Sequence, residues 1–567
     1  MCFGKREVGY RAVEGIWNLD QETRTVTSVH LRTQGAAMLH STEGTDAQLD
    51  YPMTGLALQV ANKVDTAGVM LKPGVIETLR TREVPVEQFT LLRVHHVRGR
   101  LLDGAAGPPW EIARNIVGRS DFRRGCPPPG TTRGLYRYQN SGMPSTADDW
   151  ARDLCRYVDA SPSPFHAVDE SARRLEDAGF AAISPDDDCP TPGRWYLRSG
   201  GALVAWVDAD RSADAPLRVI GAHTDSPNLR VKPLPDHGAL GLRQVGVEVY
   251  GGALLNSWLD RDLGISGRLV VRNGDGRLEH LVRDDRPIAR IPQLAIHLDR
   301  EVSDKGLLLN PQTHLSPIVG AGLAEPGAFT TSLAAMADVD PADVLAFDAM
   351  FHDVVPACLS GPDDEFVSAA RLDDLLSCHA GTEALIAVAG HDSIRDVGPA
   401  VPVLALFDHE EVGSVSATGA AGPLLHRTLR RFVNLDGRRV RGSLALSVDG
   451  THGTHPNYTE RHDGEHPVLL NGGPVLKFNA KERYATDAPA AAELRQIAEQ
   501  ASVPLQSFVS RSDMPCGTPI GPATAASTGL LTVDLGVAQL AMHSAREFCG
   551  SQDPAMLGRL LEAALAG

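Results

Sequence analysis

The sequence predicts an α/β protein, in which a sandwich of helices and sheet is interrupted by a second domain made mainly of strands. Two observations lead to this prediction. From Ala147 onward, strand-like apolar runs alternate with amphipathic stretches at helical spacing, which is the pattern of an α/β sandwich. Between about Pro235 and Gly361 the pattern changes to short strand-like runs, polar turns and prolines, which indicates an insertion.

Local signals define the expected elements. Residues 164–179 are amphipathic and end on glycine, as many helices do. The stretches 195–207 and 217–221 are typical of strands. Further along the main domain, we expect helices at 373–389 and 490–501, strands at 401–407 and 443–448, and a mostly apolar stretch at 530–541. In the insertion, strands are expected at 246–250 and 267–271.

The chain divides into three parts. Residues 1–142 have no sustained helical or strand period and no motif that carries chemistry. They are either a regulatory or docking segment or, as we favour, a loosely ordered extension or sequence upstream of a start at Met143. Residues 143–235 and 361–567 are expected to form the main domain, and residues 236–360 the inserted domain.

Charge and cysteine content exclude several classes of protein. The net charge is −17, and residues 1–142 carry 18 Lys and Arg against 14 Asp and Glu, so the remainder is strongly acidic. Such a surface is a poor binder of nucleic acid, and it repels acidic ligands unless a local cation captures them. The eight cysteines are scattered without a C-x-x-C pair, which fits a reducing compartment. No signal peptide or bilayer-spanning stretch is visible, so we expect a cytoplasmic protein without a membrane partner.

Metal-capable side chains follow three of the expected strands. Because ligands bind at the carboxyl ends of strands in an open α/β sheet, these side chains should meet at one edge. Two more candidates lie at the start of a helix and at the end of an apolar run. Each alone is more often structural, but their coincidence in five segments indicates a metal site. The candidates are His223, Asp225, Asp373, the Asp408–Glu411 run, Asp449 and His543.

These side chains suit hydrolysis by two metal ions. Imidazole and carboxylate ligands favour Zn²⁺, with Mn²⁺ or Co²⁺ possible. A pair of such ions activates water near neutral pH and polarises a scissile carbonyl. A carboxylate beside that water can take its proton and pass it to the leaving amine. The neighbouring Glu410 and Glu411 provide one ligand and one such base, since consecutive side chains near a strand end point in different directions.

Seven motifs, in this order, resemble those of the aspartyl aminopeptidases, a family of dinuclear zinc metallopeptidases. The resemblance covers about residues 148–562, and the ordered set is specific, whereas DHEEVGS alone would leave room for other two-zinc peptidases. The motifs are AHTDSPNLRVKP (222–233), IPQLAIHLDR (291–300), SAARLDDLLS (368–377), DHEEVGS (408–414), HPNY (455–458), MPCGTPIGP (514–522) and MHSAREF (542–548).

The resemblance implies a set of metal ligands and a fold. His223 and Asp449 would hold one zinc ion. Glu411 and His543 would hold the other, with Asp373 bridging the two. The implied fold is a three-layer α/β/α metallopeptidase domain with an inserted, mainly β dimerisation domain. The main domain would therefore be catalytic.

Further roles also follow from the resemblance. Asp225 would orient a ligand histidine, and Glu410 would be the general base and then the general acid. His297, in the inserted domain, would reach a neighbouring subunit's site to steady the reacting carbonyl. Lys477 would meet the acidic side chain of the substrate, with Tyr484 nearby. The implied substrates are peptides with N-terminal Asp or Glu, and the implied assembly is a homo-dodecamer built from dimers.

One segment departs from the family pattern. After Asp449 the sequence reads DGTHGTHPNY, where the family usually has Met and small apolar residues before HPNY. Local packing and pocket shape are therefore expected to differ. His455, in HPNY, is similar to a family histidine that supports assembly or the site.

Two other functions stay open at this stage. A related two-zinc hydrolase acting on other N-terminal residues or on acylated amino acids would share the ligands without needing Lys477. A scaffold or cargo protein could keep the shell and lose catalysis, but all five ligands and Glu410 are present. We therefore favour an exopeptidase that releases acidic residues from the N-termini of peptides.

Overall fold

The computed structural model describes residues 13–20, 25–32, 39–41, 70–71, 92–93, 146–184, 187, 192–208, 215–390, 399–432, 442–517 and 520–567. The chain separates into two compact units, Met1–Arg133 and Gly134–Gly567. The first unit contains a small sheet, whereas the sequence predicted no sustained period there. Its strands are β1 (Val13–Asp20), β2 (Thr25–Arg32), β3 (Leu39–Ser41), β4 (Met70–Leu71) and β5 (Leu92–Arg93). The β-branched residues of β2 are the strand signal that this prediction overlooked.

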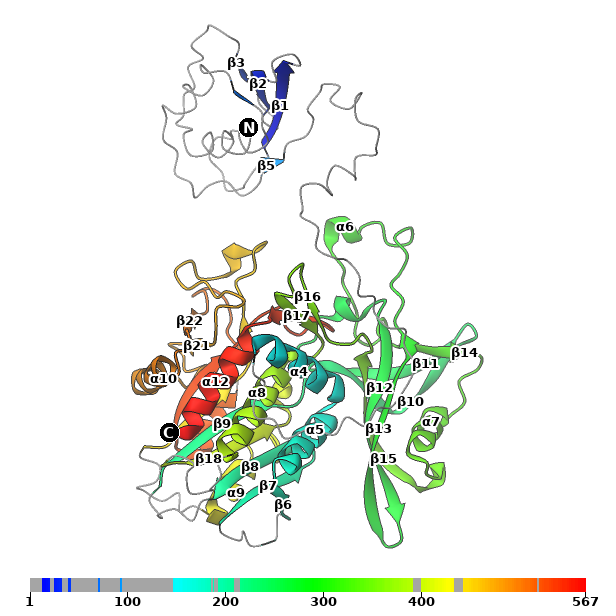
Figure 1. Cartoon of the computed structure of the whole chain (residues 1–567). Helices are drawn as coiled ribbons and strands as arrows, with labels where there is room; N and C mark the ends of the chain where they lie inside the picture. The colour runs from blue at the N-terminus through cyan, green and yellow to red at the C-terminus, as the bar shows by residue number, and fades with distance from the viewer. Residues whose placement is uncertain are drawn as a thin grey trace. The chain divides into compact units, whose positions relative to one another are not determined.

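A nine-stranded mixed sheet forms the centre of the second unit (Figure 1). Its strands, from one edge to the other, are β22 (Gln506–Val509), β21 (Val475–Phe478), β23 (Leu531–Gly536), β19 (Leu444–Val448), β9 (Leu217–His223), β18 (Val401–Phe407), β8 (Ala202–Asp208), β7 (Gly193–Ser199) and β6 (Ala181–Ala182). The middle strands β23, β19, β9 and β18 run parallel to one another. Their carboxyl ends therefore share one edge.

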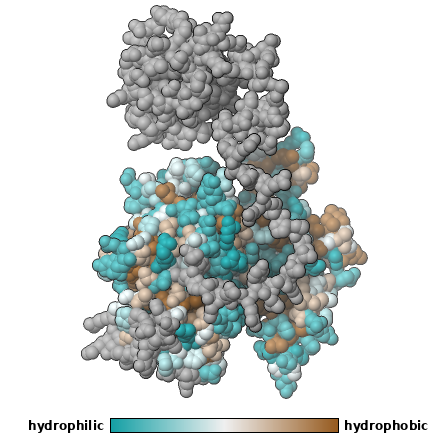
Figure 2. Space-filling view, viewed as in Figure 1, coloured by the Kyte–Doolittle hydropathy of each residue, from teal (hydrophilic) through white to brown (hydrophobic). Residues whose placement is uncertain are grey.

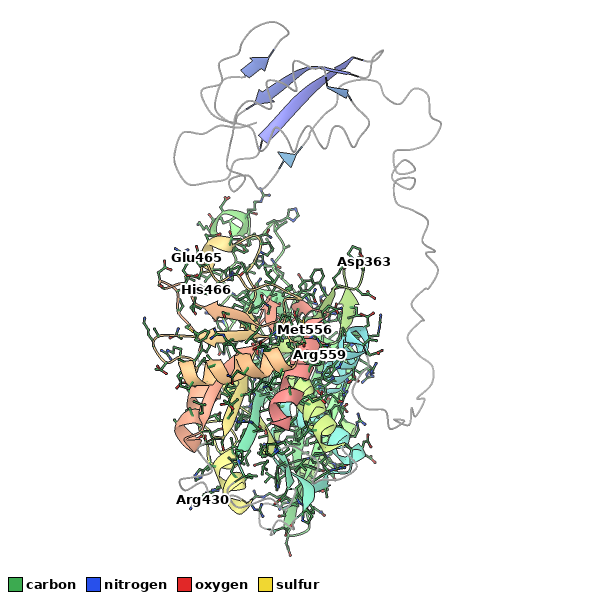
Figure 3. The ribbon with its side chains drawn as sticks, turned by 60° about the vertical axis from the view of Figure 1, so that its left-hand side comes forward. Asp363, Arg430, Glu465, His466, Met556 and Arg559 are labelled. Carbon is green, nitrogen blue, oxygen red and sulfur yellow. The ribbon has the colours of Figure 1, made fainter. Side chains whose placement is uncertain are left out.

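Helices cover both faces of this sheet. Alternate residues of one strand enter different cores: Ile220 of β9 packs in the larger core, and Val219 in the smaller one. On the larger side lie α4 (Ala147–Ala160), α5 (Pro164–Asp177), α8 (Leu372–Ala389), α10 (Ala488–Gln500) and α12 (Asp553–Ala566). On the smaller side lie α9 (Leu424–Phe432) and α11 (Ile520–Thr528). Figure 3 shows Met556 and Arg559 on α12 and Arg430 on α9, from these two opposite layers.

The insertion folds as a closed antiparallel barrel with its own core. Around the barrel, the strands are β10 (Asn228–Ala239), β11 (Leu242–Tyr250), β14 (Ile318–Ala321), β13 (Gly276–Arg290), β12 (Asp262–Asn273) and β15 (Val344–Asp353). Helix α7 (Ala328–Ala337) packs on β13. Strand β10 crosses residue 236, where the sequence placed the start of the inserted domain, and the domain boundaries themselves stay a prediction.

A smaller five-stranded sheet and a few short helices complete the second unit. The strands are β16 (Cys358–Ser360), β17 (Phe366–Ala369), β25 (Glu547–Gly550), β24 (Ala538–Leu540) and β20 (Thr451–His452). The short helices are α6 (Val302–Lys305) and the 3₁₀ turns η2 (Leu255–Trp258), η3 (Pro341–Asp343), η5 (Glu410–Val412) and η6 (Thr459–Arg461). None of the described helices combines the length and the apolar character that crossing a bilayer requires.

Most predicted elements of the main domain are confirmed, with differences in how they are divided. The strand at 401–407 is confirmed residue for residue, and the helix predicted at 164–179 is α5. The single strand predicted at 195–207 is instead the hairpin β7–β8, because Gly200 turns the chain at a φ of 60°. The apolar stretch at 530–541 likewise divides into β23 and β24.

Candidate metal centre

Three neighbouring parallel strands bring the predicted ligands to one edge of the central sheet. Strand β9 ends at His223, which pairs in register with Phe407, the last residue of β18. Strand β19 lies on the other side of β9 and is followed directly by Asp449. The polar residues after these strands therefore lie close together, as their positions in the sequence predicted.

Asp373 lies between the two predicted histidine ligands. Its Oδ1 is 3.4 Å from Nε2 of His223, and its Oδ2 is 3.5 Å from Nε2 of His543. On the first side, Oδ1 of Asp449 is 3.5 Å from the same nitrogen of His223. On the other side, Oε1 of Glu411 is 3.4 Å from Nε2 of His543. The arrangement is that of two adjoining ligand sets that share Asp373.

These residues fit a pair of divalent ions. Oδ1 of Asp373 and Oε1 of Glu411 are buried and have no hydrogen-bond partner, although buried polar atoms are almost always satisfied. Two ligand atoms that each lie about 2.1 Å from one tetrahedral ion are separated by about 3.4 Å, which agrees with the spacings above. Three carboxylates and two imidazoles around this space are ligands suited to zinc.

The electrostatics of the site also favour bound divalent ions. Burial, followed by the neighbouring charge of Asp373, raises the pKa of Glu411 well above its usual range. Burial opposes charging of His543, but Asp373 and Glu411 raise the pKa of this imidazole to about 10. Without cations, Glu411 and His543 are therefore both pushed to bind protons. Divalent ions require deprotonated ligands and would reverse both shifts.

Glu410 lies beside the two ligand sets, on the side of His223. Its Oε2 is 3.9 Å from Nε2 of His223. Burial, partly opposed by His223 and reinforced by Asp449, raises the pKa of Glu410 to about 8. A carboxylate with such a pKa can both accept and return a proton near neutral pH.

Asp225 holds the loop that carries the two glutamates. Its Oδ1 accepts the backbone N–H of Glu410 at 3.0 Å, and its Oδ2 accepts that of Glu411 at 3.1 Å. The hydroxyl of Tyr250 donates to the same Oδ2 at 2.7 Å. Nδ1 of His223 is closer to the backbone oxygen of Asp225, at 2.9 Å, than to its carboxylate, at 3.5 Å. The orientation of His223 therefore depends first on this carbonyl.

Lys477 lies next to Asp449 but is almost fully buried. Its Nζ donates to the backbone oxygen of Gly450 at 2.7 Å and is 3.5 Å from Oδ2 of Asp449. The ring of Tyr484, also buried, lies 5.5 Å from this ammonium. Burial, followed by the hydrogen bond with Cys516, raises the pKa of Tyr484. Lys477 and Tyr484, two of the three residues predicted for substrate binding, are thus on the Asp449 side of the centre.

His297 and His455 are placed differently. His297 is exposed in a turn of the inserted domain, and none of the hydrogen bonds and ion pairs recorded for the described residues joins it to the predicted ligands. His455 accepts the backbone N–H of Asn457 at 3.1 Å and packs edge-on against Tyr458. Neither side chain is brought to the centre within one chain.

Two acidic residues of the centre were missed by sequence reasoning. Asp374 Oδ2 accepts the backbone N–H of His223 at 3.1 Å. The carboxylate of Glu547 accepts the backbone N–H groups of Asp373 and His543. No periodic signal marks either residue, although both lie inside motifs of the family resemblance.

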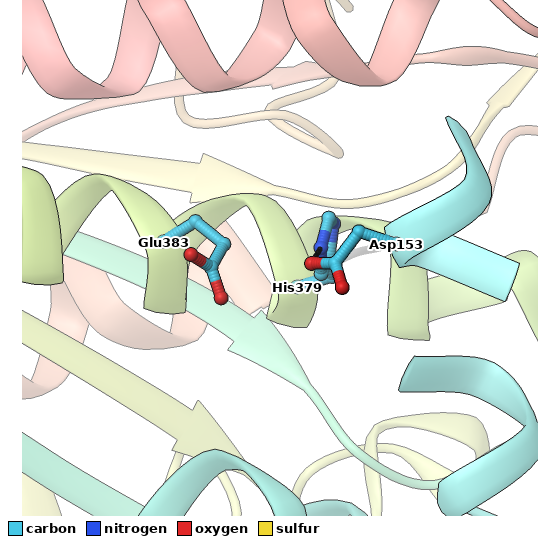
Figure 4. Close-up of side chains that lie close together, drawn as sticks. All are labelled: Asp153, His379 and Glu383. Carbon is cyan, nitrogen blue, oxygen red and sulfur yellow. Dashed lines mark hydrogen bonds and ion pairs between the residues drawn. The ribbon is translucent and has the colours of Figure 1, made fainter. Parts of the chain in front are cut away.

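A second group of metal-capable side chains lies within the helical layer (Figure 4). It comprises Asp153 of α4 with His379 and Glu383 of α8. The guanidinium of Arg174 already joins the two carboxylates, at 2.6 Å from Asp153 and 2.7 Å from Glu383. Although burial opposes it, His379 and Arg174 hold the pKa of Asp153 well below its usual range. We therefore interpret this group as a buried ion-pair network that joins α4, α5 and α8.

The layered α/β fold and the cluster of predicted ligands around Asp373 are typical of a metal-dependent hydrolase. Residues 157–563 match the family model described as Aminopeptidase I zinc metalloprotease (M18). The chain belongs to the M18 family and is a metalloaminopeptidase.

Similar proteins include both curated relatives and solved structures. The chain is 51% identical over 424 residues to a probable M18 family aminopeptidase 2 of Streptomyces coelicolor, covering 73% of this chain and 96% of the relative. The cryo-EM structure of the Ape4 and Nbr1 complex is 34% identical with a TM-score of 0.71, covering 75% and 86% of the two chains. The mApe1 dodecamer of S. cerevisiae is 27% identical with a TM-score of 0.64, covering 73% and 96%.

Proposed function

We propose that this protein hydrolyses the N-terminal peptide bond after acidic residues, Asp or Glu, with two zinc ions. His223 and Asp449 would hold one ion, and Glu411 and His543 the other, with Asp373 between them. The observation that carries the proposal is the pair of adjoining ligand sets around Asp373, with spacings of 3.4 to 3.5 Å and two buried oxygens that lack partners.

The chain itself would supply the proton transfer. When bound, the two metal ions polarise the scissile carbonyl and lower the pKa of a water molecule. Glu410 is the general base and then the acid, because its carboxylate adjoins the ligand sets and its raised pKa suits both directions of transfer. The carboxylate of Asp225 holds the backbone of Glu410 in place by accepting a hydrogen bond from the N–H group of Glu410.

Specificity for acidic residues is assigned to Lys477. This chain is strongly acidic overall, so binding an acidic N-terminal side chain requires a local cation. The ammonium of Lys477 lies beside the predicted ligand Asp449, and the ring of Tyr484 is next to it. In the alternative, the enzyme acts on other N-terminal residues, and Lys477 serves only to hold the Gly450 carbonyl.

The peptide assay tests the substrate class directly. Peptides beginning with Asp, Glu, Leu or Lys are assayed after chelation and after restoration of one metal at a time. We expect activity to be lost on chelation, restored by Zn²⁺, and highest on the acidic peptides. Lys477→Ala should remove the preference for acidic peptides, whereas Lys481→Ala, an exposed lysine of the same segment, should keep it. A preference for acidic peptides that survives Lys477→Ala would contradict the role of Lys477, and a parent protein without this preference would favour the alternative specificity.

The assembly is proposed to be a dodecamer built from dimers through the barrel. A relative forms a dodecamer, and the barrel of this chain exposes large apolar side chains. Figure 2 shows apolar surface over the barrel. Leu240, between β10 and β11, is fully exposed, and Leu234 of β10 and Leu308, between α6 and β14, are more than nine-tenths exposed, which is typical of a contact surface. His297, on the same domain, would then reach the centre of a neighbouring subunit.

The cytoplasm is the proposed compartment. Five cysteines in the described part of the chain are free thiols: Cys155, Cys358, Cys378, Cys516 and Cys549. Free thiols are typical of a reducing environment.

A further inference from the structure

Glu547 connects the backbones of two predicted ligands. It is the first residue of β25, and only 2% of its surface is exposed. Its Oε2 accepts the backbone N–H of Asp373 at 2.9 Å, and its Oε1 accepts the backbone N–H of His543 at 2.6 Å. One buried carboxylate therefore joins two segments that are 170 residues apart in the sequence.

The backbones that Glu547 holds are irregular. Asp373 precedes the regular part of α8, with φ −82° and ψ 105°, and its N–H has no helical partner. His543 lies in a turn with a φ of 67°, a conformation that is unfavourable for a residue with a Cβ atom. Without Glu547, two N–H groups would lack an acceptor, and neither segment has regular secondary structure to keep its shape.

Other predicted ligands are held in a related way. Asp374 accepts the N–H of His223, and Asp225 accepts that of Glu411. Asp449 differs, because its N–H donates to the backbone oxygen of Leu535 at 3.0 Å. Glu547 is distinctive because both groups it binds belong to one ligand set, the one formed by Asp373, Glu411 and His543.

We infer that Glu547 is a positioning residue of the metal centre: it fixes the separation of Asp373 and His543, and with it the affinity of the ion that these two residues share with Glu411. This inference rests on the ligand assignment of the proposed function. Glu547 itself contacts neither substrate nor metal. The effect of Glu547 reaches the ion only through the two backbone N–H groups that it binds.

Glu547→Gln tests the inference with little change of shape. The amide keeps one acceptor oxygen and presents an NH₂ group to the other backbone N–H, so one of the two hydrogen bonds is lost. We expect the ion held with Glu411 and His543 to bind about 10- to 100-fold more weakly, as for other residues that orient ligands, and the second ion, which shares only Asp373 with it, to be weakened less. Titration of the metal-free full chain with Co²⁺, followed by its absorption spectrum, and zinc content by mass spectrometry measure both affinities.

The chain offers a matched control in Asp553. This carboxylate is fully buried and accepts the backbone N–H groups of Asn471 at 2.7 Å and Gly473 at 2.9 Å, neither of which is a predicted ligand. Asp553→Asn should therefore lower stability by the same kind of defect but leave both metal affinities unchanged.

Three results would overturn the inference. In the first, Glu547→Gln binds both ions as tightly as the parent protein. In the second, Asp553→Asn weakens metal binding to the same extent, which would make the effect one of general stability. If Glu547→Gln does not fold, amide hydrogen exchange of the metal-free parent decides: slow exchange at Asp373 and His543 supports the inference, and fast exchange overturns it. A parent protein that binds fewer than two ions would instead contradict the proposed function.

Discussion

Glu410 and Glu411 are adjacent in sequence but have different surroundings. Glu411 contacts the imidazole of His543, whereas Glu410 adjoins His223 at a longer distance. His409 has a left-handed backbone conformation and precedes the short 3₁₀ turn η5, and together they direct the two glutamate side chains apart. The two glutamates can therefore have separate duties, one as a ligand and one as the proton carrier.

Glu410→Gln should separate catalysis from metal binding. The amide cannot accept a proton, so we expect turnover to fall by about 10²- to 10⁴-fold while the metal content stays at two ions. Turnover of acidic peptides and zinc content measure the two effects. Glu176→Gln, at an exposed position of α5, is the control and should change neither. Near-normal turnover in Glu410→Gln would exclude its role as general base.

Close packing of β23 against Asp449 makes Gly536 sensitive to substitution. A Cβ atom at this position would meet the backbone oxygen of Asp449 at a distance far below van der Waals contact. Gly536→Ala must therefore displace the end of β19 together with its carboxylate. We expect a destabilisation of about 1 to 3 kcal/mol, as for overpacked cores, together with weaker metal binding.

Thermal unfolding and Co²⁺ titration check this prediction. Gly464→Ala provides the comparison, because a Cβ atom there would meet no atom within 4 Å. If Gly536→Ala bound both ions with normal affinity, the packing of β23 would not control Asp449.

The first turn of α5 makes stability depend on pH. Burial, followed by the charge of Arg283, lowers the pKa of His166 to about 4, and its Nδ1 is 2.7 Å from the hydroxyl of Ser163. Between pH 6.5 and 4 the unfolded chain binds a proton here that the folded chain does not. This contribution to stability is therefore present above pH 6.5 and is lost as the pH falls towards 4.

His166→Asn should remove that dependence. From pH 7.5 to 5.5 the parent protein should lose about 1 kcal/mol of unfolding free energy through this residue, and the variant should lose correspondingly less. Urea unfolding at the two pH values measures the difference. Equal losses in both proteins would show that His166 is protonated alike in the folded and unfolded states.

At the scale of the whole molecule, the role proposed for His297 requires that subunits meet. Its side chain is exposed on the inserted domain, and the apolar surface of the same domain suits contact with another copy. In a symmetric dimer each subunit can lend this histidine to the other. A fully active monomer would contradict the arrangement.

Co-expression of two inactive variants tests this exchange. Glu410→Gln retains His297, and His297→Ala retains Glu410, so a mixed dimer contains one complete site if the histidine acts between subunits. We expect about a quarter of the parent activity, because half of the dimers are mixed and one of their two sites is complete. If His297 acts within its own subunit, no activity returns.

The sequence alone predicted the α/β class, the strand at 401–407 and the set of residues that meets at the sheet edge. This was possible because apolar strands and the polar residues that follow them are local patterns. The Gly200-Gly201 turn between β7 and β8 also had a local signal, but it was overlooked.

Only the tertiary structure decided how the centre is held together. Glu547 binds the backbone of Asp373, Asp225 that of Glu411, and the Lys477 ammonium the carbonyl of Gly450. Arg174 likewise forms ion pairs with Asp153 and Glu383, so this group is an ion-pair network. The partners in most of these contacts are far apart in the chain, and a backbone N–H or carbonyl carries no mark of residue type. Such contacts therefore leave no pattern in the sequence and depend on how the whole chain folds.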